Sequence, residues 1–249
     1  MQNDGDGKIH YSTLKQIEQS PAHYRWAITH ERADSPAMRQ GRALHALYLQ
    51  CVAPVQIAGK KRAPTDSVDA LAPAEYDTVQ RMFDALQSDA RAKEILSRCP
   101  EREHAMEWDL MGLQCAGRLD LRGPGILADL KSCRASFPRK FLWDAEHMHY
   151  DAQLPWYDVA GGVKLIGPDT AWSEQYLIAV ESAAPHNVMV YRLDPLRIDQ
   201  GWAKCERWMH TLKNCLESGA WPGYLEGIQT WDGELSFGES DENDESEGE

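Results

Sequence analysis

Two short apolar runs separated by a tight loop constrain the fold of this chain more than any other feature. The runs cover residues 113–121 and 126–133, and residues 122–125 between them read Arg-Gly-Pro-Gly. Glycine and proline supply the backbone dihedrals of tight turns, and apolar runs of this length are typical of strands. The stretch therefore predicts a β-hairpin with a four-residue loop.

The predicted hairpin gathers three charged side chains on one face. With a four-residue loop, Asp120 lies opposite Leu127, and alternation along the second strand places Asp129 and Lys131 on the same face as Asp120. Diagonal neighbours across strands are close enough to contact a common ligand. Two carboxylates and an ammonium are costly in an apolar core, but they suit a divalent metal ion and a phosphate. An ion pair on an exposed strand face is the alternative interpretation of Asp129 and Lys131.

The composition is that of a soluble globular protein. The chain has 249 residues, enough for one large domain or two small ones, and hydrophobic residues make up 43% of it and charged residues 26%. No run approaches the ~18 apolar residues of a membrane span, so we expect a cytoplasmic protein without a membrane segment. The six cysteines are scattered and form no C-x-x-C pair, which argues against a zinc site and a disulfide framework.

The net charge of −13 is concentrated at one end of the sequence. Residues 232–249 contain nine of the 39 acidic residues and no lysine or arginine, so the remainder has 26 basic and 30 acidic residues. The body is therefore close to neutral, and its bulk charge neither indicates nor excludes binding to nucleic acid. The segment itself has too few apolar residues for a core, and we expect residues 232–249 to be a disordered acidic tail.

Capping and turn signals divide the rest of the chain into helices and strands. Residues 1–8 read as a disordered leader, Thr13 and Gln16 form a capping box for a first helix, and the Ser35-Pro36 pair starts a second. Further helices are expected at residues 74–98, 137–149, 151–165 and 194–217, with a break near Ser88, and strands at residues 55–57, 103–110, 172–181 and 187–193. This order predicts one domain over residues 9–231, a mixed sheet with helices on both faces, of the α/β or α+β class.

Three motifs, taken in this order, resemble the RecB-like branch of the PD-(D/E)xK nuclease superfamily. Asp120, Asp129 and Lys131 resemble the signature motif, with Leu-Asp in place of Pro-Asp. The upstream and downstream segments resemble the GxxxH and QxxxY motifs of that branch, through Gly41-x-x-x-His45 and Gln153-x-x-x-Tyr157. Four further segments resemble the nuclease domain of RecE-type exonucleases (exonuclease VIII): residues 11–26, residues 41–49, Glu103 and residues 221–224. The resemblance extends over residues 9–226.

The resemblance implies a restriction-endonuclease-like core and a Mg²⁺-dependent exodeoxyribonuclease, with Mn²⁺ as a substitute metal. Such enzymes digest linear duplex DNA from 5′ ends and leave 3′ single-stranded tails for a single-strand annealing protein, in phage or bacterial DNA recombination and repair. The resemblance also implies a ring-shaped homo-oligomer around the DNA. Two alternatives stay open, a structure-selective or single-strand nuclease of the same fold and an inactive nuclease-like DNA-binding protein.

The same resemblance assigns roles to the motif residues. Asp120 and Asp129 hold the metal with the Leu130 carbonyl, and Lys131 orients or activates the attacking water. His45 lies near the metal, although imidazole suits Mn²⁺ better than Mg²⁺.

Other candidates follow from position in the sequence. Glu103 corresponds to an acidic strand residue of the family, with Glu101 and Glu107 as rivals, and the QxxxY pair lies on one helix face to orient the site or bind DNA. Three arginines close to the motifs either contact phosphates or are simply solvated: Arg42, Arg118 and Arg134. No iron–sulfur cluster is expected, since the closely spaced late cysteines of cluster-containing relatives are missing.

Truncation after Trp231 is predicted to strengthen DNA binding at low salt. A flexible polyanion tethered to a DNA-binding body competes with DNA for the same basic surface, and salt screens this competition. The affinities of the truncated and full-length chains for one duplex should therefore differ at low salt and converge as the salt concentration rises. Equal affinities across the salt series would show that the tail does not compete, leaving partner docking through Leu235 and Phe237, or no role, as its explanation.

Overall fold

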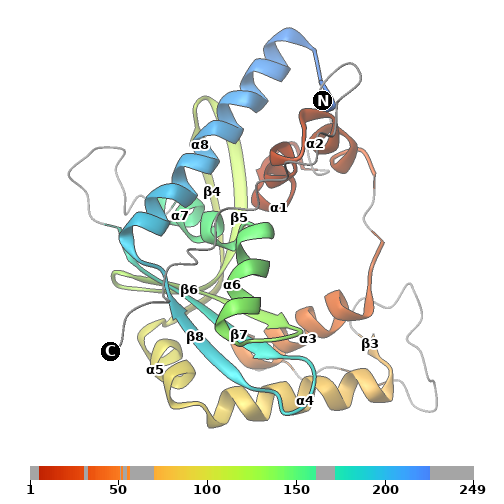
Figure 1. Cartoon of the computed structure of the whole chain (residues 1–249), viewed down its shortest axis with the longest axis vertical. Coiled ribbons are helices and arrows are strands. Elements are labelled where there is room, and N and C mark those ends of the chain that lie inside the picture. The colour runs from red at the N-terminus through yellow and green to blue at the C-terminus, as the bar shows by residue number, and fades with distance from the viewer. Residues whose placement is uncertain are drawn as a thin grey trace, which may run out of the picture.

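A mixed β-sheet runs through the middle of the molecule, with helices on both sides of it, as the computed structural model shows (Figure 1). The structure describes residues 6–30, 33–50, 52, 55–56, 70–160 and 172–224, with the backbone alone at 55–56. The predicted acidic tail, most of the predicted leader and the end of the helix predicted at 151–165 lie outside these residues. Among the helices that are described, none has the length and apolar character needed to span a bilayer.

In the described part of the chain the main sheet has six strands. They are Ile9–His10 (β1), Glu101–Leu110 (β4), Leu113–Gly123 (β5), Ile126–Cys133 (β6), Glu174–Glu181 (β7) and Val188–Arg192 (β8). β6 and β7 are parallel, as are β1 and β5, while the other neighbours are antiparallel. A separate two-stranded parallel sheet joins Val55–Gln56 (β2) to Ala70–Leu71 (β3). β1 and β3 were not predicted, because two residues are too few to show a periodic pattern.

The predicted hairpin is present, but its loop is shorter than expected. Gly123 pairs with Ile126, so the connection is residues 124–125 alone and the register differs by two residues from the predicted one. Gly125 has a φ of 70°, a left-handed conformation that glycine adopts without strain. Because side chains alternate with a period of two, a shift of two residues leaves the three charged side chains of the hairpin on one face.

The strands that flank β5 open a fork in the sheet. β4 pairs with β5 along almost its whole length, whereas β6 pairs with residues 121–123 and β1 with residues 115–116. Because a strand has two edges, β1 and β6 must share the same edge of β5. Among the described strands, residues 117–120 have no ladder partner on that edge. Asp120 therefore lies where β5 and β6 part.

Two layers of helices cover the sheet and build two cores. One layer contains α3 (Pro36–Gln50), α4 (Pro73–Ser88) and α5 (Ala90–Arg98); the other contains α1 (Tyr11–Leu14), the 3₁₀ helix η1 (Lys15–Glu18), α2 (Pro21–Ala27), α6 (Pro138–His147), α7 (Tyr150–Ala160) and α8 (Pro195–Ser218). Alternation along the central strands divides their apolar side chains between these layers. Leu127 and Leu177 face the α7–α8 core, and Ala128 and Ile178 face the α3–α5 core.

Most of the predicted helix boundaries are confirmed, and one is wrong. Ser35 caps α3 by accepting a hydrogen bond of 3.2 Å from a backbone N–H of the first turn. The break expected near Ser88 separates α4 from α5, and Asp89 caps α5. Thr13 does not cap a long first helix, since its hydroxyl donates to a backbone carbonyl. The chain there forms two short turns, and α2 starts afresh with Ser20 as its cap.

One proline and one glycine allow α8 to pack closely against α7. Pro155 lies inside α7, and it has no N–H to donate to the Asp151 carbonyl four residues earlier. Gly201 of α8 lies against this carbonyl, so closely that a Cβ on Gly201 would overlap the oxygen. This contact fixes the position of α7, the helix that carries Gln153 and Tyr157.

Gly201→Ala is predicted to destabilise the protein, although alanine is the better helix former by about 1 kcal/mol. The added methyl would overlap a backbone carbonyl that moves only if α7 moves, and overpacking of this kind costs about 1–3 kcal/mol. Chemical denaturation followed by circular dichroism measures the change in the free energy of unfolding. Asn214→Ala, at an exposed position of the same helix, is the matched control and should be neutral or slightly stabilising. A Gly201→Ala protein as stable as the parent would contradict the close packing.

Candidate active site

Adjacent strands bring acidic side chains to the fork between β5 and β6. Glu103 of β4 lies beside Asp120 of β5, since the residues on either side of each are paired with one another. Glu103 has a φ of 49°, in the left-handed region that is uncommon for residues other than glycine. The regular strand is therefore distorted at the position that supplies a carboxylate to the fork.

The backbone of Leu130 holds Asp120 in place. The Leu130 N–H donates a hydrogen bond of 2.8 Å to Asp120 Oδ2, beyond the point where β6 stops pairing with β5. The Asp120 carboxylate thus accepts the hydrogen bond that a backbone carbonyl of β5 would accept if the two strands were still paired. The Leu130 carbonyl lies 2.9 Å from Nε2 of His45, which belongs to α3. Both polar groups of this one residue therefore contact the predicted site.

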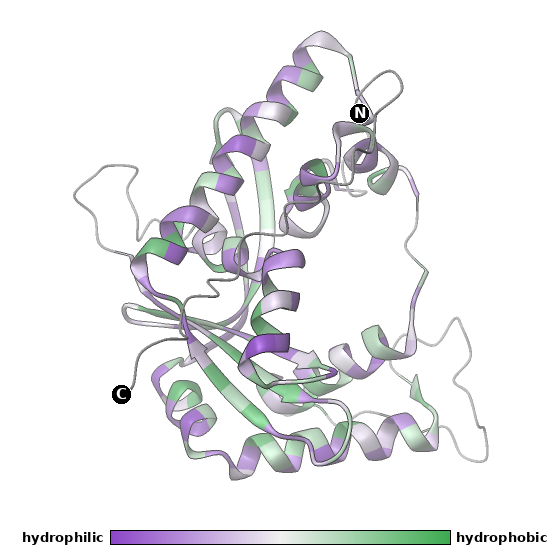
Figure 2. Ribbon diagram, in the orientation of Figure 1, coloured by the Kyte–Doolittle hydropathy of each residue, from purple (hydrophilic) through white to green (hydrophobic). Residues whose placement is uncertain are grey.

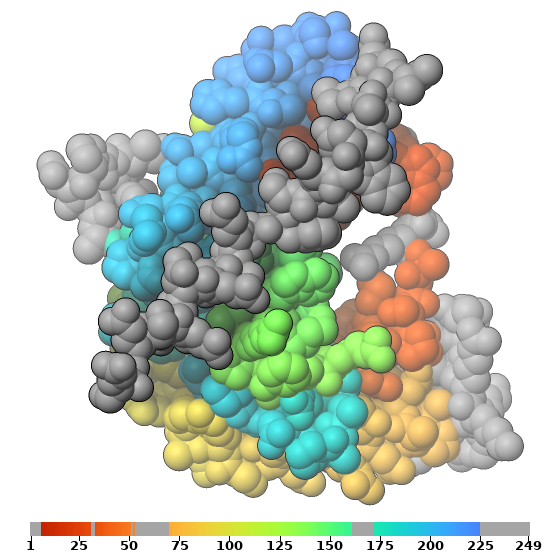
Figure 3. Space-filling model, viewed as in Figure 1, coloured from red at the N-terminus to blue at the C-terminus, as the bar shows by residue number. Residues whose placement is uncertain are grey.

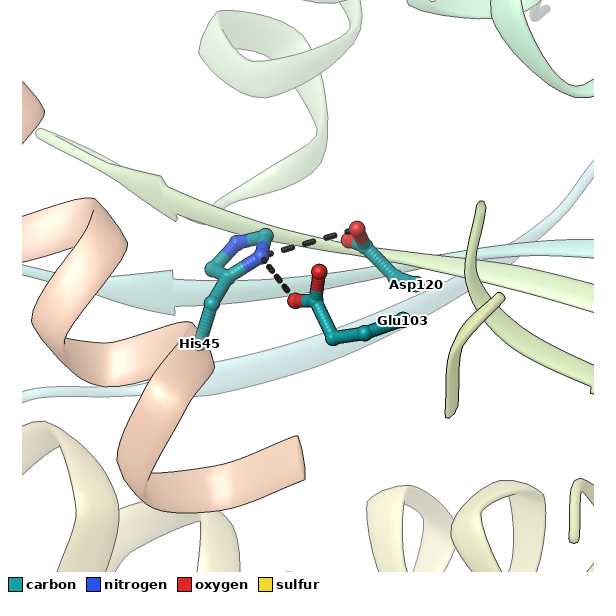
Figure 4. Close-up of side chains that lie close together, drawn as sticks. All are labelled: His45, Glu103 and Asp120. Carbon is teal, nitrogen blue, oxygen red and sulfur yellow. Dashed lines mark ion pairs between the residues drawn. The ribbon is translucent and has the colours of Figure 1, made fainter. Parts of the chain in front are cut away.

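His45 reaches the carboxylates with its other ring nitrogen. Its Nδ1 lies 3.5 Å from Asp120 Oδ1 and 3.6 Å from Glu103 Oε1 (Figure 4). Gly41, one turn earlier on α3, faces β6, where a Cβ would lie 3.4 Å from Ser132 Oγ. The GxxxH spacing is explained by this geometry, because the glycine brings the helix against the strand and the histidine then reaches the fork.

The charges of these groups depend on one another. Burial disfavours the imidazolium, but attraction from Asp120 and hydrogen bonds to Asp120 and Glu103 outweigh it and raise the pKa of His45 to about 10. Burial also disfavours the Asp120 carboxylate, yet its interaction with His45, helped by Lys131 and the Leu130 N–H, lowers its pKa. Without a metal, His45 is therefore cationic and Asp120 anionic at neutral pH.

Asp129 and Lys131 form a buried ion pair beside this group. Lys131 Nζ lies 2.6 Å from Asp129 Oδ2, and the two side chains are 16% and 2% exposed. Burial and the nearby Asp120 raise the pKa of Asp129 to about 6, against the attraction of Lys131. Burial lowers the pKa of Lys131, but attraction from both aspartates outweighs it, so the pKa rises and the amine stays charged.

The helix α7 holds the Lys131 ammonium from the other side. Nζ donates a hydrogen bond of 2.8 Å to Gln153 Oε1, and it lies 4.4 Å from the centre of the Tyr150 ring, a cation–π geometry. Tyr157 hydrogen-bonds Gln153 and the backbone of Arg118 in turn, and burial raises its pKa above the usual range. The structure thus assembles the QxxxY residues into a support for the lysine.

Glycine also makes room for Tyr157. A Cβ on Gly117 would overlap the Tyr157 ring, so the ring fits against β5 only because that side chain is missing. Gly117 belongs to the stretch of β5 that has no ladder partner on the fork side, among the strands described. α7 therefore fills the fork with Tyr157.

Of the three candidate strand acids, Glu103 is the one that lies with His45 and Asp120. Glu101 pairs with a histidine on its own strand at 3.0 Å, and Glu107 pairs with Lys8. The contact between Glu103 and the site was not settled by the sequence, because it depends on the distortion of β4.

The three candidate arginines have different positions. Arg118 is 65% exposed, and its guanidinium lies 3.4 Å from Glu103 Oε2, at the rim of the site. Arg42 forms a two-point contact with Asp34, with both distances 2.9 Å. Arg134 follows β6 and is exposed. Tyr150 was not predicted as a site residue; its spacing one turn before Gln153 was visible, but its contact with the lysine required the fold.

The chemistry of the donor atoms suits a divalent cation. One atom each from His45, Glu103 and Asp120 lies within 4.8 Å of the others. Carboxylate oxygens are the ligands that Mg²⁺ prefers, and a nitrogen donor makes Mn²⁺ acceptable. The predicted ligand set contained Asp129 and Leu130 in place of Glu103; in the structure Asp129 faces Lys131, and the Leu130 carbonyl faces His45.

Comparisons with known proteins agree with this geometry. The family model described as "PDDEXK-like domain of unknown function (DUF3799)" matches residues 10–233. No curated protein matches the sequence. A solved structure from Eubacterium rectale, described as that of a candidate exonuclease, is 10% identical, with 90% of this chain and 91% of that chain covered and a TM-score of 0.59.

A second solved structure, a phage related exonuclease from Haemophilus somnus 129PT, is 12% identical, with 86% of this chain and 96% of that chain covered and a TM-score of 0.38. The family match confirms the predicted PD-(D/E)xK-like domain, and the fold shared with the Eubacterium protein confirms the predicted architecture, a mixed sheet flanked by helices. The chain belongs to the family of PDDEXK-like domains described as DUF3799.

Proposed function

We propose that this protein is a metal-dependent DNA exonuclease that hydrolyses phosphodiester bonds of linear duplex DNA. The observation that carries the proposal is the arrangement at the fork, where three carboxylates, an imidazole and a lysine from four elements converge. A purely structural role explains this poorly, because buried like charges destabilise a fold unless something binds them. The fold shared with the Eubacterium protein, itself described as a candidate exonuclease, supports the same activity here.

The metal site consists of His45, Glu103 and Asp120, with Asp129 and the Leu130 carbonyl next to them. A bound Mg²⁺ there would lower the pKa of a water and neutralise charge that develops on the phosphate. Glu103 is kept among the catalytic residues because its carboxylate belongs to this donor set.

Lys131 acts on the substrate side of the site. An ammonium has three donors; Gln153 accepts a hydrogen bond from one of them, and Asp129 lies beside the ammonium as an ion-pair partner. A remaining donor orients the attacking water or a phosphate oxygen. Gln153, Tyr157 and Tyr150 keep the ammonium in position, and Arg118 at the rim, with Arg134, contacts the DNA backbone. Arg42 joins them only if DNA displaces Asp34.

The direction of digestion and the assembly are proposed from the RecE resemblance. We propose digestion from 5′ to 3′, producing 3′ single-stranded tails for recombination with a single-strand annealing protein as partner, and a ring-shaped homo-oligomer. An inactive DNA-binding protein is disfavoured, because the complete Asp-Asp-Lys set would then have no use.

Cleavage is predicted to require the charged residues at the fork. Lys131→Ala and Asp129→Asn should each lower the rate of digestion by about 10²–10⁴-fold, the usual contribution of a proton-handling or charge-stabilising group. Gln153→Leu should lower it about 10–100-fold, because this residue acts through the lysine. The assay compares linear with circular duplex DNA, with Mg²⁺ and with chelator. Asn214→Ala is the control. Full activity in Asp129→Asn would remove the proposed function, and equal digestion of circles would favour the structure-selective alternative.

Metal binding is predicted to release a proton from His45. The pKa of His45 is about 10 in the metal-free fold, above its ordinary value of 6.5, so the proton stabilises the fold below pH 6.5 and this contribution is lost as the pH rises through 10. Metal must displace that proton, so Mn²⁺ affinity should rise by about tenfold per pH unit between pH 7 and 9.

Titration calorimetry with Mn²⁺ in two buffers of different ionisation enthalpy measures the released protons. His45→Asn should abolish the release attributable to the imidazole and flatten the pH dependence. If Mn²⁺ binds the parent protein with the same affinity throughout this pH range, the His45 imidazole keeps its proton and is not a ligand of the metal.

A further inference from the structure

Phe137 is an exposed aromatic side chain on a rigid support. It directly precedes α6 and is 55% exposed. The preceding residue, Ser136, is 1% exposed; its N–H and hydroxyl donate to Glu181 Oε1 at 2.8 and 3.3 Å, and its carbonyl accepts from the Tyr191 hydroxyl. Pro138 follows and fixes its own φ. Phe137 is therefore presented to solvent by a backbone that is held on both sides.

The ring of Phe137 has no aromatic partner among the described residues, unlike the rings of Trp26 and Trp143. The ring of Trp26 stacks on a histidine at 4.5 Å, and the ring of Trp143 lies 3.8 Å from that of His147. Within the described part of the chain, no other ring packs on Phe137. An exposed apolar ring held in this way has an unfavourable contact with water, which a flat partner would relieve.

Phe137 is close to the proposed site of cleavage. It follows Lys131 by six residues, and an extended chain of that length spans at most about 20 Å. α6 also packs beside the lysine, since the ring of Phe141 lies 6.5 Å from the ring of Tyr150, the residue over the ammonium. Successive bases of a DNA strand are ~3.4 Å apart, so a few nucleotides cover the distance. Figure 3 shows α6 at the surface, between α8 on one side and α3 on the other.

The charges around Phe137 favour a polyanion. Residues 134–143 contain Arg134, Arg139 and Lys140 and no carboxylate, and both arginines are exposed. The first turn of α6 is strongly hydrophilic (Figure 2). Two acids beside this segment are engaged, Glu181 by Ser136 and Asp144 by Lys140.

We propose that Phe137 stacks on an unpaired base at the end of the DNA, while Arg134 and Arg139 contact the adjacent phosphates. The inference rests on the proposed nuclease function and names the surface that receives the frayed strand. Aromatic rings interleaved with cations are the usual platform for single strands, because every base has a π face and every nucleotide a phosphate. Leu142 and Trp143 of α6 are also 49% and 57% exposed, and a second copy of the chain on this surface is the outcome that the sedimentation measurement below would reveal.

The test uses full-length Lys131→Ala protein, in which DNA is bound without being digested. The probe is a duplex with a short unpaired end that carries a fluorescent base analogue at its last position. In this background Phe137→Ala should weaken binding by about tenfold or more and abolish the quenching of the analogue. Phe137→Trp should retain both, and Leu196→Ala, an exposed apolar residue outside this surface, should change neither. Thermal denaturation should show all four proteins equally folded.

A salt series separates stacking from phosphate contacts. The Arg134→Ala and Arg139→Ala double variant should reduce the slope of log affinity against log salt by about 2, one for each lost contact, whereas Phe137→Ala should leave the slope unchanged. Loss of affinity in Phe137→Ala with an altered slope and unchanged quenching would overturn the stacking role.

The remaining outcomes distinguish this inference from the proposed function. If neither the Lys131→Ala protein nor the parent protein with chelator binds DNA, the proposed function fails and the inference falls with it. If DNA is bound and Phe137→Ala binds equally well with equal quenching, the inference alone is wrong. If Phe137→Ala instead changes only self-association, measured by sedimentation, the surface is an interface between copies and the DNA proposal is overturned.

Discussion

The hydrogen bond from the Leu130 N–H to the Asp120 carboxylate is the contact on which the site depends. A hydrogen bond to a charged group is worth about 1.5–3 kcal/mol, and here it also closes the gap that opens when β5 and β6 part. The Leu130 carbonyl meets His45, so a single residue joins two strands and α3. The fork is what makes this possible, because in a continuous ladder both groups would be used by the sheet.

The fork needs support from the helices. α7 fills it with Tyr157, against a glycine, and holds Lys131 through Gln153. α7 is in turn fixed by α8, whose Gly201 approaches a carbonyl that Pro155 leaves without its usual helical donor. A proline that looks unfavourable in a helix thus has a use here, since the freed carbonyl is where the next helix packs. The position of the lysine is therefore set in part by the packing of α8 against α7.

The residues of the site were largely visible in the sequence, but their contacts were not. Spacing alone placed Asp120, Asp129 and Lys131 on one face, and this survived an error of two residues in the register because side-chain alternation has the same period. The contact of Tyr150 with the lysine could not be predicted, because it depends on how α7 crosses β6. The position of Glu103 in the site could not be predicted either, because it depends on a positive φ within β4. The two-residue β1, which helps to define the fork, leaves no pattern to read.

The electrostatics of the site explain why a proton and a metal compete for it. Three carboxylates, Glu103, Asp120 and Asp129, face one imidazolium and one ammonium inside the site, and the only further cation described there is Arg118, at the exposed rim beside Glu103. Burial makes each carboxylate costly, and repulsion by Asp120 already raises the pKa of Asp129 to about 6. The imidazolium therefore stands where a divalent cation would relieve the same repulsion with twice the charge. The metal-free fold tolerates the repulsion between these buried carboxylates, and binding of a divalent cation would relieve it.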